Sequence, residues 1–169
     1  MIKEIKILMF LPPSPYIIQL HEVYESSECI IMIFEYMPGK DLYHRIKTSQ
    51  KVSEPQAFGY FSQIVKALLF LGYHGFCHRD IKPDNILFVD EDKLKLADFS
   101  LAEEKEKMKG VCGTPGYMAP EIFHQQKYNE KIDVFSLGVV LYLMLLINFV
   151  NSSLKHFFYN EKVNRRVIV

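Results

Sequence analysis

Four polar residues between positions 80 and 98 have the types and spacing needed to move a phosphoryl group. Asp80, Lys82 and Asn85 follow one another closely, and Asp98 comes after a short alternating apolar stretch. A carboxylate can accept the proton of a hydroxyl group, an ammonium can balance phosphate charge, and amide and carboxylate oxygens can bind Mg²⁺. Such catalysis is mostly positioning and electrostatics. The pattern therefore predicts a phosphotransfer site whose residues are held by rigid elements.

The first 36 residues predict one helix followed by one hairpin. Residues 17–24 and 29–36 are rich in β-branched and aromatic side chains and flank a polar turn, which predicts antiparallel strands. Residues 1–10 place apolar side chains on one face of a helix that Pro12 and the prolines after it end. That face comprises Ile2, Ile5, Leu8 and Met9.

The next segments predict helices. A short helix is expected from Asp41, after a Pro-Gly turn. Ser53 and Gln56 have the spacing of a capping box, and apolar residues then recur at helical intervals as far as Gly75. We therefore expect a long helix whose apolar face packs on the core.

A second hairpin is predicted over residues 86–96, with Leu94 and Leu96 facing inward and the lysines outward. The candidate phosphotransfer residues lie at both of its ends. Residues 103–107 form a mixed-charge run, which predicts a solvated loop.

Composition limits the classes of partner. Lys plus Arg and Asp plus Glu both number 20, so no net charge favours binding to nucleic acid or to an anionic membrane. The three cysteines are far apart and odd in number, which indicates neither a disulfide framework nor a zinc pair. We expect a reducing, cytoplasmic environment.

Residues 134–150 are the only segment for which a membrane span competes with a core helix. The run is apolar nearly throughout but is shorter than the ~20 residues that normally cross a bilayer. Helices that are apolar all round also occur at the centre of soluble domains. We expect the core helix, with Asp133 at its start, and no membrane contact.

Three motifs occur in an order that resembles the eukaryotic protein kinases of the Ser/Thr type. They are HRDIKPDN at 78–85, followed by Asp98-Phe99; GTPGYMAPE at 113–121; and DVFSLGVVLY at 133–142. The sequence looks closest to calcium/calmodulin-dependent kinases. The resemblance implies an α+β, protein-kinase-like fold that is truncated, with a small-lobe remnant over 1–36, a large lobe over 37–147 and a divergent tail over 148–169.

The resemblance also implies an activity and the residues that carry it. A protein kinase transfers the γ-phosphoryl group of ATP, with Mg²⁺, to a Ser or Thr hydroxyl of a protein substrate. Asp80 would be the catalytic base, and Lys82 would lie near the γ-phosphate. Asn85 and Asp98 would hold the metal, and Thr114 would contact Asp80.

Nucleotide-binding residues are implied in the same way. Glu4 matches the helix glutamate that pairs with a nucleotide-binding lysine on an earlier strand. Phe34 would line the back of the adenine pocket, and Glu35 to Met37 would form the hinge that holds adenine. Asp41 would reach the ribose.

A stacked apolar spine between the two lobes is a further implication. Its members would be Leu8, Leu20, His78 and Phe99, with the carboxylate of Asp133 anchoring the base. Such a spine acts through packing, so these residues are also expected in the core.

Arg79 matches an arginine that, in the resembling family, pairs with a phosphate on the activation segment, which corresponds to residues 98–121 here. This chain has Gly110 where relatives often carry the phosphorylated threonine. We therefore expect Glu103, Glu104 or Glu106 to pair with Arg79 in place of a phosphate.

Two departures from the family pattern bear on catalytic efficiency. Ser100 replaces the glycine of the Asp-Phe-Gly motif, which restricts the backbone and adds a hydroxyl. Only three residues precede Glu4, so a Gly-rich loop and its lysine are expected to be missing. A catalytically inactive kinase-like binding module is therefore the alternative to an enzyme. A regulatory protein or calcium sensor is a further expected partner of a full-length parent.

Overall fold

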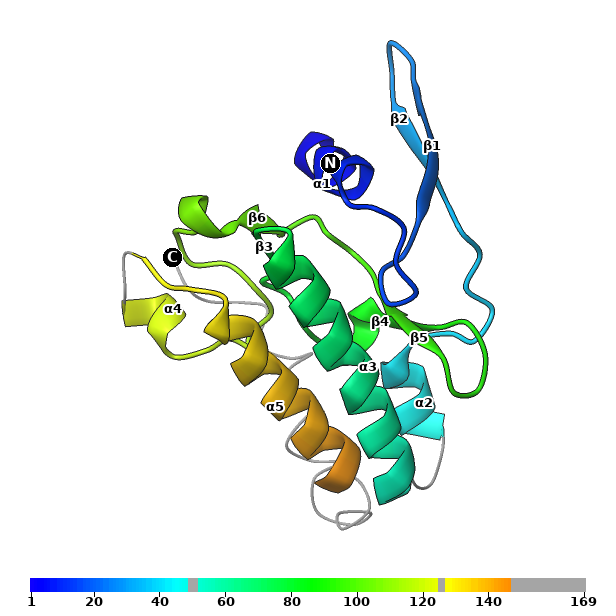
Figure 1. Ribbon diagram of the computed structural model, residues 1–169, viewed down its shortest axis with the longest axis vertical. Helices are drawn as coiled ribbons and strands as arrows, with labels where there is room; N and C mark the ends of the chain where they lie inside the picture. The colour runs from blue at the N-terminus through cyan, green and yellow to red at the C-terminus, as the bar shows by residue number, and fades with distance from the viewer. Residues whose placement is uncertain (49–51, 125–126, 147–169) are drawn as a thin grey trace, which may run out of the picture.

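The computed structural model describes residues 1–48, 52–124 and 127–146. Two long helices, α3 (Glu54–Tyr73) and α5 (Lys131–Leu146), run side by side and form the body of the molecule. Helix α1 (Ile2–Phe10) and the hairpin of β1 (Leu20–Glu25) and β2 (Ile30–Phe34) lie beyond one end of this body, as Figure 1 shows. The arrangement is the expected α+β fold, mainly helical in its larger part.

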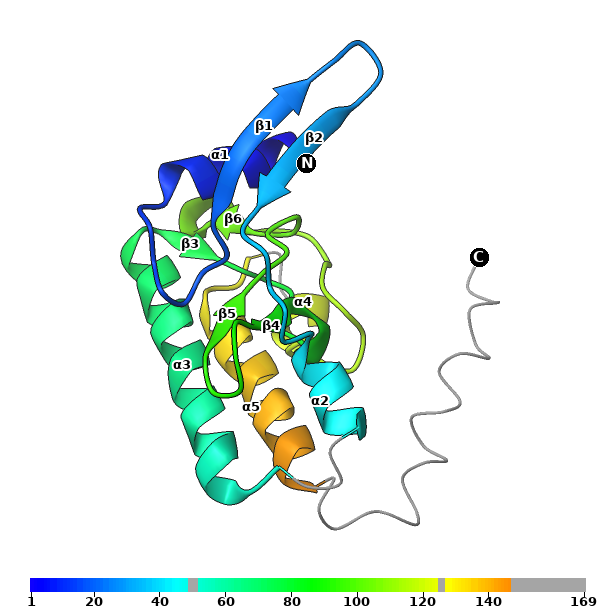
Figure 2. The same ribbon diagram turned by 90° about the vertical axis from the view of Figure 1, so that its right-hand side faces the viewer.

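The β1–β2 hairpin has the predicted antiparallel pairing, with Val23 opposite Met32. Its first strand begins later than expected, because Ile17 instead forms a parallel bridge with Leu96 of another sheet. Figure 2 shows the hairpin extending away from the helical body, with α1 against β1.

The buried face of α1 differs from the prediction. Ile2 and Met9 are 63% and 72% exposed, whereas Glu4, Ile7 and Leu8 are buried. These three residues and Leu11 follow the i, i+3, i+4, i+7 spacing of a helical stripe. The prediction was therefore wrong for Ile2 and Met9, because the predicted face counted apolar residues alone, whereas Leu8 is buried as expected.

Helix α3 begins as predicted. Ser53 accepts a hydrogen bond from the Gln56 backbone, and the Gln56 side chain bonds the Ser53 backbone, which completes the capping box. The chain leaves the helix through Gly75, whose φ of 81° suits glycine. Helix α3 buries Ala57, Tyr60, Ile64, Ala67 and Leu71.

Helix α5 packs in the core, as expected. Leu137, Val140 and Met144 belong to the main apolar cluster. Among residues 1–48, 52–124 and 127–146, no helix combines the length and apolar character needed to span a bilayer. Residues 147–150 of the predicted apolar run lie outside the described residues.

Short elements between α3 and α5 carry the candidate site residues. Strands β4 (Ile86–Phe88) and β5 (Leu94–Leu96) form the predicted hairpin, preceded by the 3₁₀ turn η1 (Pro83–Asn85). Helices α2 (Leu42–Thr48) and α4 (Glu121–His124) flank this region.

The mixed-charge run is more ordered than a solvated loop. Glu103–Glu104 form strand β6, which pairs with β3 (Phe76–Cys77), and Lys105–Lys107 form the 3₁₀ turn η2. The loop prediction was therefore wrong in part. Charge pattern alone does not report the backbone pairing with β3, which lies far away in the sequence.

Candidate active site

Asp80 is buried at the centre of a polar cluster whose other members, Lys82 and Thr114, are partly exposed. Its Oδ1 accepts a hydrogen bond from Thr114 Oγ1 at 2.6 Å, and its Oδ2 accepts one from Lys82 Nζ at 2.7 Å. Lys82 Nζ also lies 2.9 Å from Thr114 Oγ1. Burial raises the pKa of Asp80, but the bonds from Lys82 and Thr114 outweigh it and leave the pKa below its usual value. The carboxylate is therefore charged at neutral pH.

Asn85 completes this cluster from η1. Its Nδ2 donates to the Asp80 carbonyl oxygen at 2.9 Å and to Oδ2 at 3.2 Å, and its side chain is buried. The amide nitrogen is thus committed to Asp80, which leaves the amide oxygen to face a cation.

The backbone of the loop that carries Asp80 is strained, and hydrogen bonds to Asp133 hold it in place. Arg79 has a φ of 67°, which is uncommon for a residue other than glycine. The carboxylate of Asp133 accepts the backbone N–H groups of His78 at 2.7 Å and Arg79 at 2.8 Å, and the Cys77 thiol at 3.0 Å. Burial, with Asp133 beside it, raises the pKa of the Cys77 thiol, which stays protonated and donates.

The predicted spine residues lie as the packing argument requires. The rings of His78 and Phe99 meet edge to face at 4.9 Å, and both side chains are fully buried. Leu8 is buried, and Leu20 packs against the same cluster. Burial lowers the pKa of His78, so the ring is neutral and its Nε2 bonds the Ala97 carbonyl oxygen.

Asp98 is exposed and, like Arg79, has a left-handed backbone, with φ of 60°. Its Oδ1 accepts the hydroxyl of Ser100 at 2.7 Å and the Ser100 backbone N–H at 3.3 Å. Ser100 thus occupies one oxygen of the predicted metal ligand, an interaction that glycine could not make in full.

The donor set at Asn85 and Asp98 suits Mg²⁺. One amide oxygen and one carboxylate are hard ligands, and Mg²⁺ sites usually combine one or two protein carboxylates with substrate phosphates and water. In the described part of the chain, no group of three or more His, Cys, Asp and Glu side chains gathers as a metal cage would require. A cation here would therefore need phosphate oxygens as well.

The predicted hinge residues connect β2 to α2. Phe34 pairs with Leu20 across the hairpin, and Met37 packs against the core. Asp41 Oδ1 accepts the His44 backbone N–H at 2.6 Å and so caps α2, a role that the sequence analysis missed.

Glu35 forms an ion pair that the sequence did not indicate. Its carboxylate oxygens lie 2.6 and 2.8 Å from Lys95 Nζ, and Oε1 also accepts the Gln19 backbone N–H. Lys95 was expected to face solvent, but this pair fixes it between β5 and the hinge. Only the three-dimensional structure brings these two residues together.

Glu4 points inward from α1 toward Asp98 and Phe99. Burial raises the pKa of its carboxyl, and the nearby charge of Asp98 raises it further. Within the described residues, no lysine, arginine or histidine lies at ion-pair distance from Glu4. The N-terminal ammonium and a hydrogen bond with the Phe99 backbone offset the rise in the pKa of Glu4 only in part.

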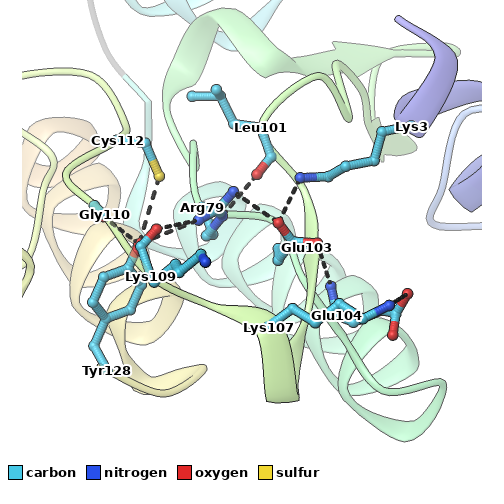
Figure 3. Close-up of polar contacts among 10 residues, drawn as sticks. All are labelled: Lys3, Arg79, Leu101, Glu103, Glu104, Lys107, Lys109, Gly110, Cys112 and Tyr128. Carbon is cyan, nitrogen blue, oxygen red and sulfur yellow. Dashed lines mark hydrogen bonds and ion pairs between the residues drawn. The ribbon is translucent and has the colours of Figure 1, made fainter. Parts of the chain in front are cut away.

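Arg79 has the acidic partner that was expected. Glu103 Oε2 lies 3.6 Å from Arg79 Nη2, whereas Glu104 pairs with Lys107 instead. Figure 3 shows that Glu103 also reaches Lys3, a residue of α1 that the sequence analysis did not consider.

Comparison with known sequences decides the family. The model described as "Protein kinase domain" matches residues 1–166. The chain belongs to the protein kinase family. Kinases of this family generally use ATP and Mg²⁺, and the truncated α+β kinase-like fold expected from the motifs fits the observed architecture.

Relatives of this kinase include Ser/Thr enzymes. Calcium/calmodulin-dependent protein kinase type 1 of Caenorhabditis briggsae is 35% identical over 147 residues, which is 84% of this chain and 41% of that protein. Serine/threonine-protein kinase DCLK3 of Mus musculus is 43% identical over 136 residues, covering 78% of this chain and 17% of that protein. Protein kinase C epsilon type of Oryctolagus cuniculus is 38% identical over 147 residues, with 84% and 20% covered. The chain thus spans less than half the length of these relatives.

Proposed function

We propose that this kinase chain carries the catalytic loop, metal ligands and substrate side of a protein serine/threonine kinase. The observation that carries the proposal is the Asp80 cluster, in which Thr114 and Lys82 each hold one carboxylate oxygen. We propose the same division as the sequence suggested, with a small-lobe remnant over 1–36, a large lobe over 37–147 and a divergent tail over 148–169; residues 147–169 lie outside the described part of the chain.

Each side chain has a defined part in the transfer. ATP supplies the γ-phosphoryl group when bound. Asp80 orients the substrate hydroxyl and accepts its proton, since the carboxylate is charged and fixed by two donors. Lys82 places its ammonium beside the transferring group, and Thr114 holds Asp80 facing the substrate.

Nucleotide contacts follow from the same assignment. Asn85 and Asp98 would hold Mg²⁺, which neutralises phosphate charge. The backbone between Glu35 and Met37 would hold adenine, with Phe34 behind it and Asp41 near the ribose. Glu4 would pair with a lysine that approaches the phosphates. A protein substrate follows from this chemistry, and a calcium sensor is proposed as a regulator from the similarity to calmodulin-dependent relatives.

The competing proposal is a kinase-like binding module without phosphotransfer. The observation that favours it is Glu4, whose buried carboxyl has no lysine, arginine or histidine at ion-pair distance among the described residues. Such a module would keep its large-lobe surface for a partner protein.

Two measurements distinguish the enzyme from the binding module. One is calorimetry with MgATP, and the other is a radiolabelled transfer assay on a Ser/Thr peptide library. The enzyme proposal expects Mg²⁺-dependent ATP binding, and transfer that falls by at least about 10²-fold in Asp80→Asn. Asp84→Asn is the matched control, because Asp84 is exposed and lies in the same loop. Absence of both binding and transfer in the wild-type chain would favour the module.

A further inference from the structure

Arg45 is a partly buried arginine of α2 that contacts two other elements. Helix α2 lies beside β4 in both views (Figures 1 and 2). The guanidinium carbon of Arg45 lies 3.7 Å from the centre of the Phe88 ring on β4, close enough for a cation–π contact. Its Nη1 donates a hydrogen bond to the Tyr60 hydroxyl of α3 at 2.9 Å. One side chain therefore joins α2 to β4 and to α3.

The same guanidinium also holds the turn between β4 and β5. Arg45 Nη2 donates to the Asp90 carbonyl oxygen at 3.2 Å, and Nη1 donates to the Glu91 carbonyl oxygen. The Tyr60 hydroxyl donates to the same Glu91 oxygen at 3.2 Å. A planar guanidinium can stack on a ring and donate several hydrogen bonds at its edge, whereas an ammonium is a compact point charge. This set of contacts therefore requires arginine.

Phe88, the ring under Arg45, belongs to the core. Its side chain is fully buried, and the Tyr60 ring meets it edge to face with 5.0 Å between the ring centres. A cation–π contact is stronger where the ring and the cation are shielded from water. The contact with Arg45 therefore holds α2 to a rigid part of the molecule.

The backbone of Phe88 connects this cluster to the segment that follows the predicted hinge. The Gly39 N–H donates to the Phe88 carbonyl oxygen at 2.9 Å, and the Phe88 N–H donates to the carbonyl oxygen of the residue after Gly39 at 2.8 Å. Asp41, the predicted ribose residue, forms an isolated antiparallel bridge with Leu87. This segment therefore runs along β4, which starts directly after the predicted metal ligand Asn85.

We propose that Arg45 is a positioning residue for the nucleotide. By stacking on Phe88, it holds the segment after the hinge against β4, and so fixes the spacing between the adenine-side residues and Asn85. The effect on nucleotide binding rests on the proposed function, whereas the link between α2 and β4 does not. Arg45 acts through Phe88 and the β4–β5 turn, and not by touching the nucleotide itself.

Calorimetry with MgATP on the full chain tests the effect on nucleotide binding. Arg45→Met keeps a long apolar side chain but removes the guanidinium, and should weaken MgATP binding by about tenfold. Arg45→Lys should recover part of this loss, because an ammonium can still lie over the ring. Lys47→Met is the matched control, since Lys47 is an exposed cation of the same helix that approaches only the Tyr43 ring, at 5.9 Å. Its affinity for MgATP should equal that of the wild type.

Steady-state kinetics separate a positioning role from a general loss of folded protein. Arg45→Met should raise the KM for ATP by about tenfold while kcat stays within about twofold of wild type, because none of the contacts of Arg45 involves the Asp80 cluster. A loss of folded protein would lower kcat and leave KM unchanged. That second result would overturn the proposal.

Hydrogen–deuterium exchange tests the link between α2 and β4 without any need for activity. Arg45→Met should speed exchange in residues 39–41 and 86–88 by about tenfold relative to Lys47→Met, while exchange in α5 stays unchanged. Unchanged exchange in both segments would contradict the proposal. An equal increase throughout the described residues would also contradict it, because the effect would then be a global loss of stability.

Tyr60→Phe is a second variant that keeps the proposal testable if Arg45→Met fails to fold. It removes only the hydroxyl that bonds both Arg45 and Glu91, and should cause a smaller increase in exchange in the same two segments. A wild-type chain without ATP binding or transfer would refute the proposed function and with it the effect on the nucleotide. The exchange measurement would still decide whether Arg45 holds the segment after the hinge against β4.

Discussion

Asp133 and His78 are separated by 55 positions in the sequence, yet one carboxylate fixes the backbone that presents Asp80. Both oxygens of Asp133 accept backbone N–H groups, one of them from the strained Arg79. A residue with φ of 67° persists only where its surroundings compensate for the strain. The position of the Asp80 carboxylate therefore depends on a residue at the start of α5.

Replacing Asp133 by Asn tests this dependence. An amide offers one acceptor oxygen and turns a donor toward the N–H and thiol groups that now bond a carboxylate. We expect a loss of about 1–3 kcal/mol or more in the free energy of unfolding, measured by urea denaturation. Asp84→Asn is the control, and as an exposed change it should stay within about 0.5 kcal/mol of wild type. A similar small effect for Asp133→Asn would contradict the anchoring role.

Ser100 leads to a prediction about metal affinity. Its hydroxyl bonds Asp98 Oδ1 and competes with a cation for that oxygen. Ser100→Ala removes the hydroxyl without adding backbone freedom, so Mg²⁺ affinity in the presence of ATP should rise by roughly two- to tenfold, the worth of one hydrogen bond. Calorimetric titration of Mg²⁺ measures the change. Weaker Mg²⁺ binding in Ser100→Ala would mean that the hydroxyl orients Asp98 for the metal.

At the scale of elements, Gly39 fixes how the hinge approaches β4. A Cβ added at Gly39 would lie 2.5 Å from the Phe88 Cβ and 2.7 Å from the Phe88 carbonyl oxygen, which accepts the Gly39 N–H. Gly39→Ala should therefore cost about 1–3 kcal/mol of stability through overpacking. It should also weaken any ATP binding, because the displaced segment follows Met37.

Gly59 in α3 is the matched glycine. A Cβ there meets nothing within 4 Å, so Gly59→Ala should raise stability by about 0.5–1 kcal/mol through helix propensity alone. Thermal denaturation of both variants measures whether Gly39→Ala lowers stability while Gly59→Ala raises it. Equal effects at the two sites would refute the argument from close approach.

Local patterns predicted the elements better than the contacts between them. The capping box at Ser53 and the β4–β5 hairpin depend on residues close in sequence, and both were confirmed. Links such as Lys95 with Glu35 depend on chain segments that meet only after folding. The face assigned to α1 was wrong in part for another reason: periodicity was applied to apolar residues alone, whereas the buried stripe includes the carboxyl residue Glu4.

Among site residues, the motif spacing led to Asp80, Lys82 and Thr114, which the structure brings within hydrogen-bond distance. The resemblance, together with Gly110, limited the expected partners of Arg79 to three glutamates. Burial and the contacts with Lys3 and Arg79 distinguish Glu103 from the two exposed ones, and neither property is visible in a run of alternating charges. Roles of all these residues in catalysis remain predictions.

For the whole molecule, stability should depend on pH through carboxyl groups of opposite behaviour. The pKa values of Asp80 and Glu103 are lowered in the folded chain by their cationic partners, after the opposing effect of burial. Each contributes stability above its unfolded-state pKa, and that contribution is lost as pH falls through the folded-state value. Acid should therefore loosen the loop that carries Asp80 and the segment that carries Glu103 together.

Glu4 has the opposite effect on the pH dependence of stability, since burial and then Asp98 raise its pKa. Its contribution favours folding at low pH and is lost as pH rises through the folded-state pKa. Glu4→Gln should therefore increase the free energy of unfolding at neutral pH, with the gain disappearing on acidification, whereas Glu103→Gln should lower it at neutral pH and converge with wild type in acid. Urea denaturation at a series of pH values measures both differences. If Glu4→Gln destabilised the chain at neutral pH, the charged Glu4 carboxylate would stabilise the fold. The argument that its position beside Asp98 lowers the stability of the folded chain would then be wrong.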